Sequence, residues 1–498
     1  MMDKPLKMLA FDFGASSGRA ILGTLSDDKL TIEEIHRFSN DPVQIRGSLY
    51  WDILRLFYEI KQGILKCVNS GHRDIESMAV DTWGVDFGLL DGDGNLLGNP
   101  YHYRDPRTDG MVEEVFKIVS REELYSRTGT EIMKINSLFQ LYSMKFHNSP
   151  LLREARTLLF TPDLFNYFLT GVKATEYSIA TTSQMLDAEK RTWAVDIIER
   201  LGLPKDILTD IVPSGTVVGT LSSEIAHELG AREIPVIAAA GHDTQAAIAS
   251  VPASGEDYVY ISCGTWSLMG IENDKPIINE KSSRLSFTNE GGVNNRICFL
   301  KNIMGLWLVQ ECKRQWDREG DNLSFAQLES MAREAKPFTA FVDPDDELLF
   351  APGDMPWKVK EFCRRTGQPV PESKGEIVRC IIESLAMKYR LTLDSLEDIL
   401  GRRIPVVHMM GGGIKDKMLC QHTANATGRE VIAGPVEATS VGNLMIQAMA
   451  LGRVKSLGEA RRIVRNSFPT AVYQTQDAGA WAEAYERFKK IVQNKVYR

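Results

Sequence analysis

Apolar runs that end in polar glycine turns occur in both halves of the chain and predict β-hairpins. In the first half, Lys7–Phe13 and Ala20–Leu25 predict two strands joined by a short polar turn, and Thr31–Phe38 predicts a third. In the second half, a strand that begins at Tyr258 enters a glycine turn and returns as Ser267–Ile271. The shared strand–turn–strand pattern predicts an internal duplication with two similar lobes.

Strands and amphipathic helices alternate over most of the chain, which favours the α/β class. Further strands are predicted at 75–80, 236–240 and 406–410, and helices after Asp52 and at 244–250, 375–400 and 441–451. Residues 175–187 are predicted as a loop with a short strand, and residues 287–293 as a loop. Asn302 is predicted to open a long helix that runs toward Trp316.

Length and charge narrow the class of protein. A chain of 498 residues is expected to form about three units of ~150 residues or two large ones. Its net charge of −8 argues against a nucleic-acid partner, because a basic excess is needed to release counterions. No apolar stretch approaches ~20 residues, and the first apolar run is interrupted by Asp12, so we expect no membrane partner and no signal peptide. The seven cysteines are widely scattered, as expected for reduced thiols of a cytoplasmic protein.

Candidate chemistry begins with two aspartates that follow buried strands. Asp243 lies where the strand at 236–240 meets a helix N-terminus, close in sequence to the Gly264-Thr265 turn. A carboxylate beside a polar glycine turn suits a general base next to a phosphate-binding site. The alternative for Asp243 is a helix N-cap. Asp12 is expected to organise a metal ion, unless nearby backbone amides satisfy it.

A second polar group follows the strand at 75–80. There Trp83 stands between Asp81 and Asp86, and an indole beside carboxylates often binds sugars, the ring stacking on the sugar face while the acids take hydroxyls. Packing of Trp83 in the core is the alternative. The polar loop at 101–107 could close over the same substrate.

Glycines mark one more candidate site, and several familiar motifs are missing. Gly411-Gly412-Gly413 at a strand-to-helix turn would allow close backbone approach to a flat ligand or a phosphate, or form only a tight turn. The chain has neither a G-x-x-x-x-G-K-[ST] nor a G-x-G-x-x-G motif. His72-Arg73-Asp74 imitates a protein-kinase motif, but too little chain precedes it for a nucleotide lobe.

Five separated motifs resemble the FGGY carbohydrate kinases over roughly residues 8–453, in the right order. They are Phe11–Arg19, Asp81–Asp86, Gly241–Ala246, Ser262–Ser267 and Met410–Lys415. Within that family, the Ala-Ser-Ser-Gly-Arg turn, Asp-Thr-Trp-Gly-Val-Asp-Phe and Asn302–Trp307 are most similar to kinases of the ketose L-rhamnulose.

The resemblance implies a fold and a reaction. The fold would consist of two actin-like (RNase H-like) ATPase domains, residues 1–250 and 251–498, with ATP and sugar in the cleft between them. The reaction would transfer the γ-phosphate of ATP, with Mg²⁺, to the C1 hydroxyl of L-rhamnulose.

The resemblance also implies roles for individual residues. Asp243 matches the catalytic base, and we expect Asp12 and Asp243 to be the metal residues. The implied ATP-binding residues are Ala15, Ser16, Ser17, Gly18, Arg19, Thr265, Gln310 and Gly412. The sugar-site residues are Gly84, His242, Asp243, Thr244 and Asn302, to which the sequence argument adds Trp83 and Asp86. Cys363 and Cys380 sit where this group can carry a disulfide.

Two other functions stay open. The chain could phosphorylate another ketose or polyol (fuculose, xylulose, glycerol), with loops 81–107 and 287–310 choosing the sugar. It could also be an actin-like ATP-switch or filament protein, which would not need Trp83, Asp86 and Asp243 in one polar pocket. We expect small-molecule partners, sugar and ATP, and a monomer or small homo-oligomer.

Overall fold

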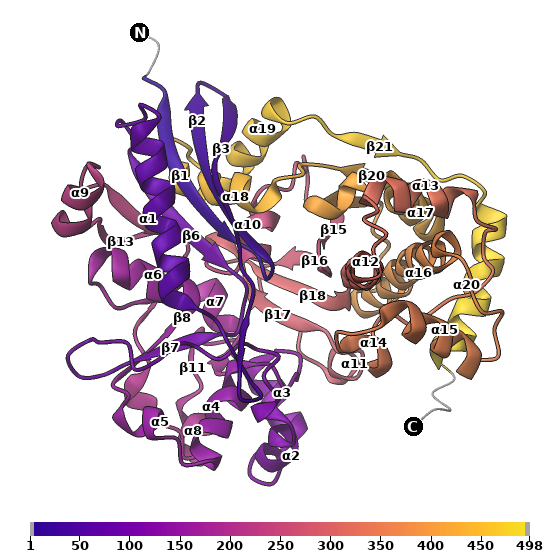
Figure 1. The fold of residues 1–498 in the computed structure, drawn as a ribbon, viewed down its shortest axis with the longest axis horizontal. Helices are drawn as coiled ribbons and strands as arrows, with labels where there is room; N and C mark the ends of the chain where they lie inside the picture. The colour runs from indigo at the N-terminus through magenta and orange to yellow at the C-terminus, as the bar shows by residue number, and fades with distance from the viewer. Residues whose placement is uncertain (1–3, 494–498) are drawn as a thin grey trace. The chain divides into compact units, whose positions relative to one another are not determined.

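The computed structural model describes residues 4–493, which form two α/β units, each with its own sheet (Figure 1). Unit 1 contains the residues up to Ser250 together with Glu272–Phe299 and Ala438–Ser467. Unit 2 contains Val251–Ile271, Leu300–Glu437 and the residues from Phe468 onward. The first unit therefore includes two segments that come late in the sequence.

The sheet of unit 1 has the strand order β13-β14-β6-β1-β2-β3. Its strands are β1 (Leu6–Phe13), β2 (Ser17–Ser26), β3 (Lys29–Ser39), β6 (Ser77–Thr82), β13 (Thr216–Thr220) and β14 (Pro235–Ala238). β1, β6 and β14 are parallel, whereas β1, β2 and β3 form an antiparallel meander. The carboxyl ends of the three parallel strands thus meet at one edge of the sheet, where ligands of open α/β sheets bind.

The helices of unit 1 cover this sheet and bury its apolar residues. They include α1 (Ile53–Asn69), α6 (Thr161–Thr170), α9 (Ser223–Leu229), α10 (Asp243–Ala249), α18 (Ala438–Ala450) and α19 (Leu457–Ser467). Asp52 caps α1, accepting the amide of Arg55 at 3.3 Å. α18 lies beside β1 and α10 (Figure 1), and a Cβ on Gly442 would stand 1.7 Å from the carbonyl oxygen of Ala246. The close packing expected of this small-residue helix is confirmed.

Between β6 and β13, unit 1 carries a group of short elements with a hydrophobic core of its own. They are β7 (Phe87–Leu90), α2 (Met111–Phe116), α3 (Arg121–Thr128), α4 (Ser137–Phe146), α5 (Pro150–Glu154), β8 (Thr157–Phe160), β9 (Thr175–Glu176), α7 (Tyr177–Thr181), β10 (Leu186–Asp187), β11 (Thr192–Trp193), α8 (Val195–Arg200) and β12 (Ile211–Val212). The segment 175–187, predicted as loop and short strand, also contains the helix α7.

The second sheet, which carries the strands of unit 2, runs in the order β17-β18-β16-β15-β19-β20-β21, with β17 (Thr288–Gly291) at its edge. Its strands are β15 (Tyr258–Cys263), β16 (Trp266–Asn273), β18 (Ile297–Met304), β19 (Val406–Met410), β20 (Glu430–Ala433) and β21 (Ala471–Tyr473). Its helices are α12 (Trp307–Arg318), α13 (Phe325–Glu334), α14 (Glu347–Phe350), α15 (Met355–Arg365), α16 (Lys374–Leu400), α17 (Lys417–Thr427) and α20 (Ala478–Gln493). The predicted hairpin at 258–271 is confirmed as β15 and β16.

Two predicted elements are wrong. Residues 287–293 are not a plain loop, because Thr288–Gly291 form the buried strand β17. Asn302 does not open a helix, because it lies in β18 and α12 begins only at Trp307. Short apolar runs fit both a strand and a buried helix, so their period alone could not decide.

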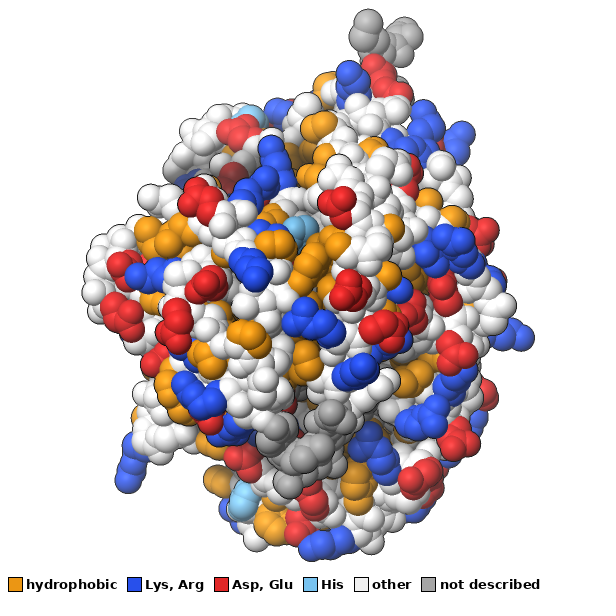
Figure 2. All heavy atoms as spheres, turned by 90° about the vertical axis from the view of Figure 1, so that its right-hand side faces the viewer, with side chains coloured by type: hydrophobic (Ala, Val, Ile, Leu, Met, Phe, Trp, Pro, Cys, Tyr) orange, Lys and Arg blue, Asp and Glu red, His pale blue; other side chains and the backbone are white. Residues whose placement is uncertain are grey.

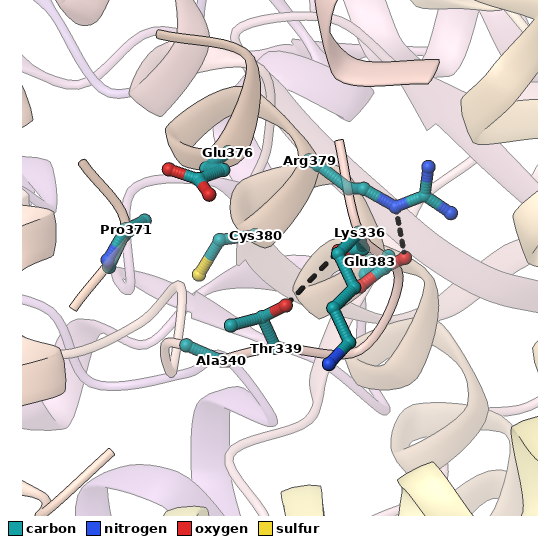
Figure 3. A pocket seen from close by; sticks show the side chains of 8 residues that line it. All are labelled: Lys336, Thr339, Ala340, Pro371, Glu376, Arg379, Cys380 and Glu383. Carbon is teal, nitrogen blue, oxygen red and sulfur yellow. Dashed lines mark hydrogen bonds and ion pairs between the residues drawn. The ribbon is translucent and has the colours of Figure 1, made fainter. Parts of the chain in front are cut away.

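The two cysteines implied as a disulfide are free thiols in the structure, on α15 and α16. Both Cys363 and Cys380 are buried. Cys380 borders a cavity of about 10 Å³, which also has Thr339, Arg379 and Glu383 in its wall (Figure 3). A space of that size holds about one water molecule. The disulfide suggested by the resemblance is therefore not formed here.

Acidic and basic side chains are interspersed over the face drawn in Figure 2. Among the ion pairs of the described residues, Glu361 on α15 pairs with both Arg364 and Arg365. Within residues 4–493, no helix has the length and apolar composition needed to cross a membrane.

Candidate active site

Three aspartates gather at the carboxyl edge of the unit 1 sheet. Asp12 on β1 and Asp81 on β6 are register partners in neighbouring parallel strands. The next residue of β6, Thr82, forms a parallel bridge with His242, which directly precedes Asp243. The edge thus brings together side chains that are about 70 and 230 residues apart in the sequence.

Asp12 is almost fully buried, and its Oδ2 has several hydrogen-bond donors. The Arg19 guanidinium donates to it at 3.1 Å from Nε and 2.9 Å from Nη2, and the Ser440 hydroxyl donates at 3.1 Å. Arg19, predicted to bind ATP phosphates, therefore pairs with the predicted metal residue. Side chains rather than backbone amides hold Asp12.

Asp81 is fully buried and only half satisfied. Its Oδ2 accepts the Asn443 amide at 2.6 Å, whereas its Oδ1 has no hydrogen-bond partner among the described residues. Burial, and then the nearby charge of Asp12, raise the pKa of Asp81 well above its usual value, although the Asn443 hydrogen bond opposes the shift. A buried oxygen without a partner is costly unless a ligand uses it.

Asp243 is the first residue of α10 and is more accessible than the other two aspartates. Its side chain is 29% exposed, and the N-cap residue of the helix is His242 rather than Asp243. Burial raises the pKa of Asp243 to about 6; the positive charge of His242 opposes the shift, and the charge of Asp12 adds to it. The Thr244 hydroxyl donates to Oδ1 at 3.3 Å. A carboxylate with this pKa can accept a proton near neutral pH.

His242 lies between two carboxylates. Its Nδ1 is 3.0 Å from Oε2 of Glu290, and its Nε2 is 3.5 Å from Oδ1 of Asp243. Burial by itself would lower the pKa of His242, but the charges of Glu290 and Asp243 outweigh it and raise that pKa. Asp243 thus has a partly positive neighbour that helps to keep it ionised.

A buried glutamate fixes the backbone just before His242. Oε2 of Glu176 accepts the amides of Gly241 at 2.9 Å and Ile179 at 3.1 Å, and the Ser178 hydroxyl accepts the amide of His242 at 3.2 Å. These hydrogen bonds therefore fix the backbone between the carboxyl end of β14 and Asp243.

The carboxylates of Asp12, Asp81 and Asp243 offer the hard oxygen donors that Mg²⁺ prefers, and the partnerless Oδ1 of Asp81 adds an acceptor that a cation or its water could use. Within residues 4–493, however, no three His, Cys, Asp or Glu side chains converge closely enough to form a complete cage. This set fits an ion that keeps several waters, as Mg²⁺ usually does.

The predicted sugar-binding residues Trp83 and Asp86 belong to a buried, hydrogen-bonded group of side chains. Asp86 is fully buried, and its carboxylate accepts hydrogen bonds from Trp51 at 2.6 Å, Trp83 at 2.9 Å and Gln140 at 2.9 Å. Burial raises the pKa of Asp86 to about 6, and these hydrogen bonds oppose the shift. The Asp86 carboxylate thus orients two indoles, and its contact with sugar hydroxyls stays a prediction.

Trp83 itself is 5% exposed and packs against Trp51 with ring centroids 4.0 Å apart. The next residue but one, Val85, has a φ of 68°, which a β-branched residue rarely adopts. The Thr182 hydroxyl accepts the amide of Val85 at 3.0 Å, and a Cβ on Gly84 would lie 3.2 Å from Thr182. Strained backbone of this kind persists at functional sites.

The polar loop at 101–107 is tied to the same group. The amide of Tyr103 donates to Asp86 at 3.2 Å, and the Arg107 guanidinium donates to the side chain of Gln140 at 2.7 Å. Arg107 also lies 4.1 Å over the ring of Tyr101. The loop thus packs around Asp86 in this structure.

The first predicted phosphate-binding turn, Ala15–Arg19, opens the hairpin between β1 and β2. Ser16 is exposed, whereas Gly18 packs under the ring of Phe38. Asn40 donates two hydrogen bonds to this part of the hairpin. Its side-chain amide donates to the carbonyl oxygen of Gly14 at 2.8 Å, and its backbone amide donates to the carbonyl oxygen of Ser16 at 3.2 Å.

The second predicted turn lies in unit 2. The Thr265 hydroxyl donates to Oε1 of Gln310 at 3.1 Å, and the Thr265 carbonyl accepts the amides of Gly305 and Trp307, each at 3.1 Å. The structure therefore brings together two of the predicted ATP-binding residues, Thr265 and Gln310, from β15–β16 and α12.

The triple glycine packs against the same hairpin. A Cβ on Gly413 would stand 2.4 Å from Sγ of Cys263, whereas one on Gly412 would meet nothing within 4 Å. Gly413 thus serves packing, and Gly412 borders open space, as an adenine-side glycine would. Asn302, predicted for the sugar site, lies near the end of β18 in unit 2.

Several residues of these sites were missed by the sequence argument. Asp81 appeared only as part of a motif, and Glu290 lies in the stretch expected to be a loop. Ser440, Asn443 and Gln447 on α18 are fully buried, and their spacing of three and four puts them on one helix face. A polar stripe within a small-residue helix was a signal that could have identified them.

Comparison with known proteins agrees with the sequence motifs. The N-terminal domain of the FGGY family of carbohydrate kinases matches residues 7–249, and the C-terminal domain of that family matches residues 259–451. A rhamnulokinase from Bacteroides thetaiotaomicron is 45% identical over 97% of this chain and 99% of its own length. One from Bacillus subtilis is 36% identical over 94% and 95%.

Solved structures share the fold at low identity. A xylulose kinase from Lactobacillus acidophilus superposes with a TM-score of 0.82 at 15% identity, covering 99% of this chain and 98% of its own. Glycerol kinase from Plasmodium falciparum has a TM-score of 0.79 at 14% identity, covering 99% of both chains. The predicted two-domain α/β kinase fold is confirmed, and the chain belongs to the FGGY family of carbohydrate kinases.

Proposed function

We propose that this chain transfers the γ-phosphate of ATP to the C1 hydroxyl of L-rhamnulose, with Asp243 as the general base. The observation that carries the proposal is the environment of Asp243. It is the most accessible of the three clustered aspartates, its pKa is raised to about 6, and it is the first residue of α10, directly after the N-cap residue His242. The choice of sugar is supported by relatives named rhamnulokinase that are 36–45% identical over nearly the whole chain.

Phosphoryl transfer depends on placement and charge neutralisation more than on covalent chemistry. Asp243 would accept the proton of the sugar hydroxyl and orient its oxygen toward the phosphorus. Bound Mg²⁺ would neutralise the charge of the phosphates, and Asp12 and Asp243 would hold it largely through water.

The remaining predicted residues divide between the two substrates. Gly84, His242, Thr244 and Asn302 would contact the sugar, while Asp86 would act indirectly, by orienting Trp51 and Trp83. Thr265, Gln310, Gly412 and the turn Ala15–Arg19 would bind ATP. The hydrogen bond between Thr265 and Gln310 supports a shared nucleotide role for these two.

A coupled ADP assay with a panel of L-rhamnulose, L-fuculose, D-xylulose and glycerol tests the proposal. We expect the highest kcat/KM for L-rhamnulose and a phosphate on C1 of the product, detected by NMR. If another sugar gave the highest kcat/KM, the assignment to the kinase family would stand, and the assignment of L-rhamnulose as substrate would be wrong. ATP hydrolysis that ignores every sugar would instead favour an actin-like switch protein.

A further inference from the structure

Glu290 is a buried carboxylate on β17 whose contacts lead to the candidate base. Its Oε2 accepts a hydrogen bond from Nε2 of Gln245 at 2.8 Å and lies 3.0 Å from Nδ1 of His242. The side chain is 5% exposed, and all three residues belong to unit 1. A carboxylate at this position has no role in the activity described so far.

The contact with Glu290 determines how the imidazole is oriented. An ionised carboxylate can only accept, so Nδ1 of His242 carries the hydrogen of that bond. The ring then directs Nε2 toward Asp243, at 3.5 Å from its Oδ1. The backbone on this side is already fixed by Glu176 and Ser178, so the remaining freedom of His242 is the rotation of its ring.

Asp243 has one further neighbour, on its own helix. The Thr244 hydroxyl donates to the same Oδ1 at 3.3 Å, and hydrogen bonds from Thr244 oppose the rise that burial causes in the pKa of Asp243. Because the Thr244 hydroxyl and Nε2 of His242 both lie at Oδ1, we expect Oδ2 to receive the substrate hydroxyl. The orientation of Asp243 therefore depends on the orientation of His242.

We propose that Glu290 is a positioning residue for phosphoryl transfer, which holds His242 so that His242 in turn orients Asp243. The inference rests on the proposed function and deepens it. Orientation of a base by a second group and of that group by a third recurs in enzymes of unrelated folds. The proton taken from the sugar stays on Asp243, and Glu290 neither gains nor loses one, as for the outer carboxylate of such triads.

A purely structural role for Glu290 makes a different prediction. Substitution of a structural residue would lower the stability of the protein, and through it the amount of active enzyme. That effect would not depend on His242. A positioning residue should lower kcat with little effect on the KM for ATP. Its effect should also disappear when the histidine is absent.

The experiment is a double-mutant cycle on kcat with Glu290→Gln, His242→Gln and the double variant, each with its thermal unfolding recorded. Glu59→Gln is the matched control, because Glu59 on α1 is also buried and its Oε2 lies 2.5 Å from Nε2 of a histidine, His36 on β3. We expect Glu290→Gln to lower kcat about 10- to 100-fold, since small misplacements of reacting groups have effects of that size. The kcat of the double variant should be no lower than that of His242→Gln alone. The kcat of Glu59→Gln should stay within about twofold of that of the parent protein.

Independent, multiplying effects of the two substitutions would overturn the proposal, as would wild-type kcat in Glu290→Gln. If Glu290→Gln does not fold, Glu290→Asp takes its place, because it keeps the charge and withdraws the acceptor from Nδ1. A readout that needs no turnover is the downfield proton signal of the hydrogen-bonded imidazole N–H, which should move upfield in Glu290→Gln, because a neutral amide oxygen is a weaker acceptor than a carboxylate, and should be unchanged in Glu59→Gln. A wild-type protein that responds to no sugar would refute the proposed function, whereas this signal would still report on the Glu290–His242 bond.

Discussion

Two aspartates at strand-to-helix junctions have the same raised pKa and different surroundings. Asp243 is the first residue of α10 in unit 1, and Asp416 directly precedes α17 in unit 2. Burial raises the pKa of each to about 6. Asp416 is the N-cap residue of its helix and accepts the amide of Leu419 at 2.9 Å, whereas Asp243 is the first residue of α10 and follows the N-cap residue His242. A raised pKa therefore does not identify a base, and the carboxylate that is not the N-cap of its helix is the better candidate.

The hairpins of the two sheets show the same contrast at matched positions. Asp12 stands two residues before Gly14 and pairs in register with Asp81, and Ser262 stands two residues before Gly264 and pairs with Met410. The duplicated framework thus carries charge in unit 1 and neutral side chains in unit 2. This difference favours metal and proton chemistry in the first unit and nucleotide contacts in the second.

The sharpest test of the first comparison is the pair Asp243→Asn and Asp416→Asn. We expect kcat of Asp243→Asn to fall by about 10²–10⁴-fold, because the amide cannot accept the sugar proton, while the KM values change little. Asn is as good a helix cap as Asp, so Asp416→Asn should keep nearly full activity. Steady-state kinetics in both substrates would measure this, and equal losses in the two variants would remove the assignment of the base.

The second comparison is tested by Asp12→Asn against Ser262→Ala. Asp12→Asn should lower kcat about 10- to 100-fold and raise the Mg²⁺ concentration needed for half-maximal activity, because one anionic oxygen is lost from the ion's surroundings. Its amide oxygen can still accept from Arg19 and Ser440, so the fold should persist. A Mg²⁺ titration of activity gives the result, and an unchanged titration curve would exclude Asp12 from the metal site. Ser262→Ala should behave as the parent.

The sequence alone predicted those features that depend on interactions between residues close together in the chain. Local patterns identified β1, the β15–β16 hairpin and the cap of α1 at Asp52, because periodicity and capping act within a few residues. The motif around Asp243 was recognisable for the same reason. Sequence patterns of this kind identify which residues could react, and they do not state which partners those residues have.

The elements that were missed are held by distant partners. Residues 288–291 are polar and glycine-rich and were therefore expected to be a loop, yet β17 is buried because its side chains find acceptors and donors elsewhere. Asn289, for instance, donates to the carbonyl of Gly129 at 3.0 Å. Likewise the sequence could not show that Asp86 accepts hydrogen bonds from Trp51, Trp83 and Gln140.

The pH dependence of activity should reflect the raised pKa of Asp243. The base works only when ionised, so kcat/KM should fall roughly tenfold per pH unit as the pH drops below about 6. An ordinary aspartate would place this limb near pH ~3.9. A profile of kcat/KM between pH ~4.5 and ~8 measures the limb. Asp416→Asn should leave the acidic limb of the profile unchanged. An acidic limb near pH ~4 in the parent protein would contradict the assignment of Asp243 as the base.

The same shift affects stability with a definite sign. Because the folded protein binds the proton of Asp243 more tightly than the unfolded chain does, this contribution to stability is present below pH ~4 and is lost as the pH rises through about 6. Asp243→Asn removes the dependence. Thermal unfolding at pH ~5 and ~7 should therefore differ less in that variant than in the parent.

The smallest expected effect concerns the neutral turn of unit 2. Thr265→Val keeps the shape of the side chain and removes the hydroxyl that donates to Gln310. Loss of one hydrogen bond of about 1 kcal/mol predicts a rise of roughly fivefold in the KM for ATP, with the KM for the sugar unchanged. Thr265→Ser keeps the hydroxyl and should stay close to the parent. If serine weakened ATP binding as much as valine, the hydroxyl would not be the group that matters, and the turn would contribute through its backbone amides alone.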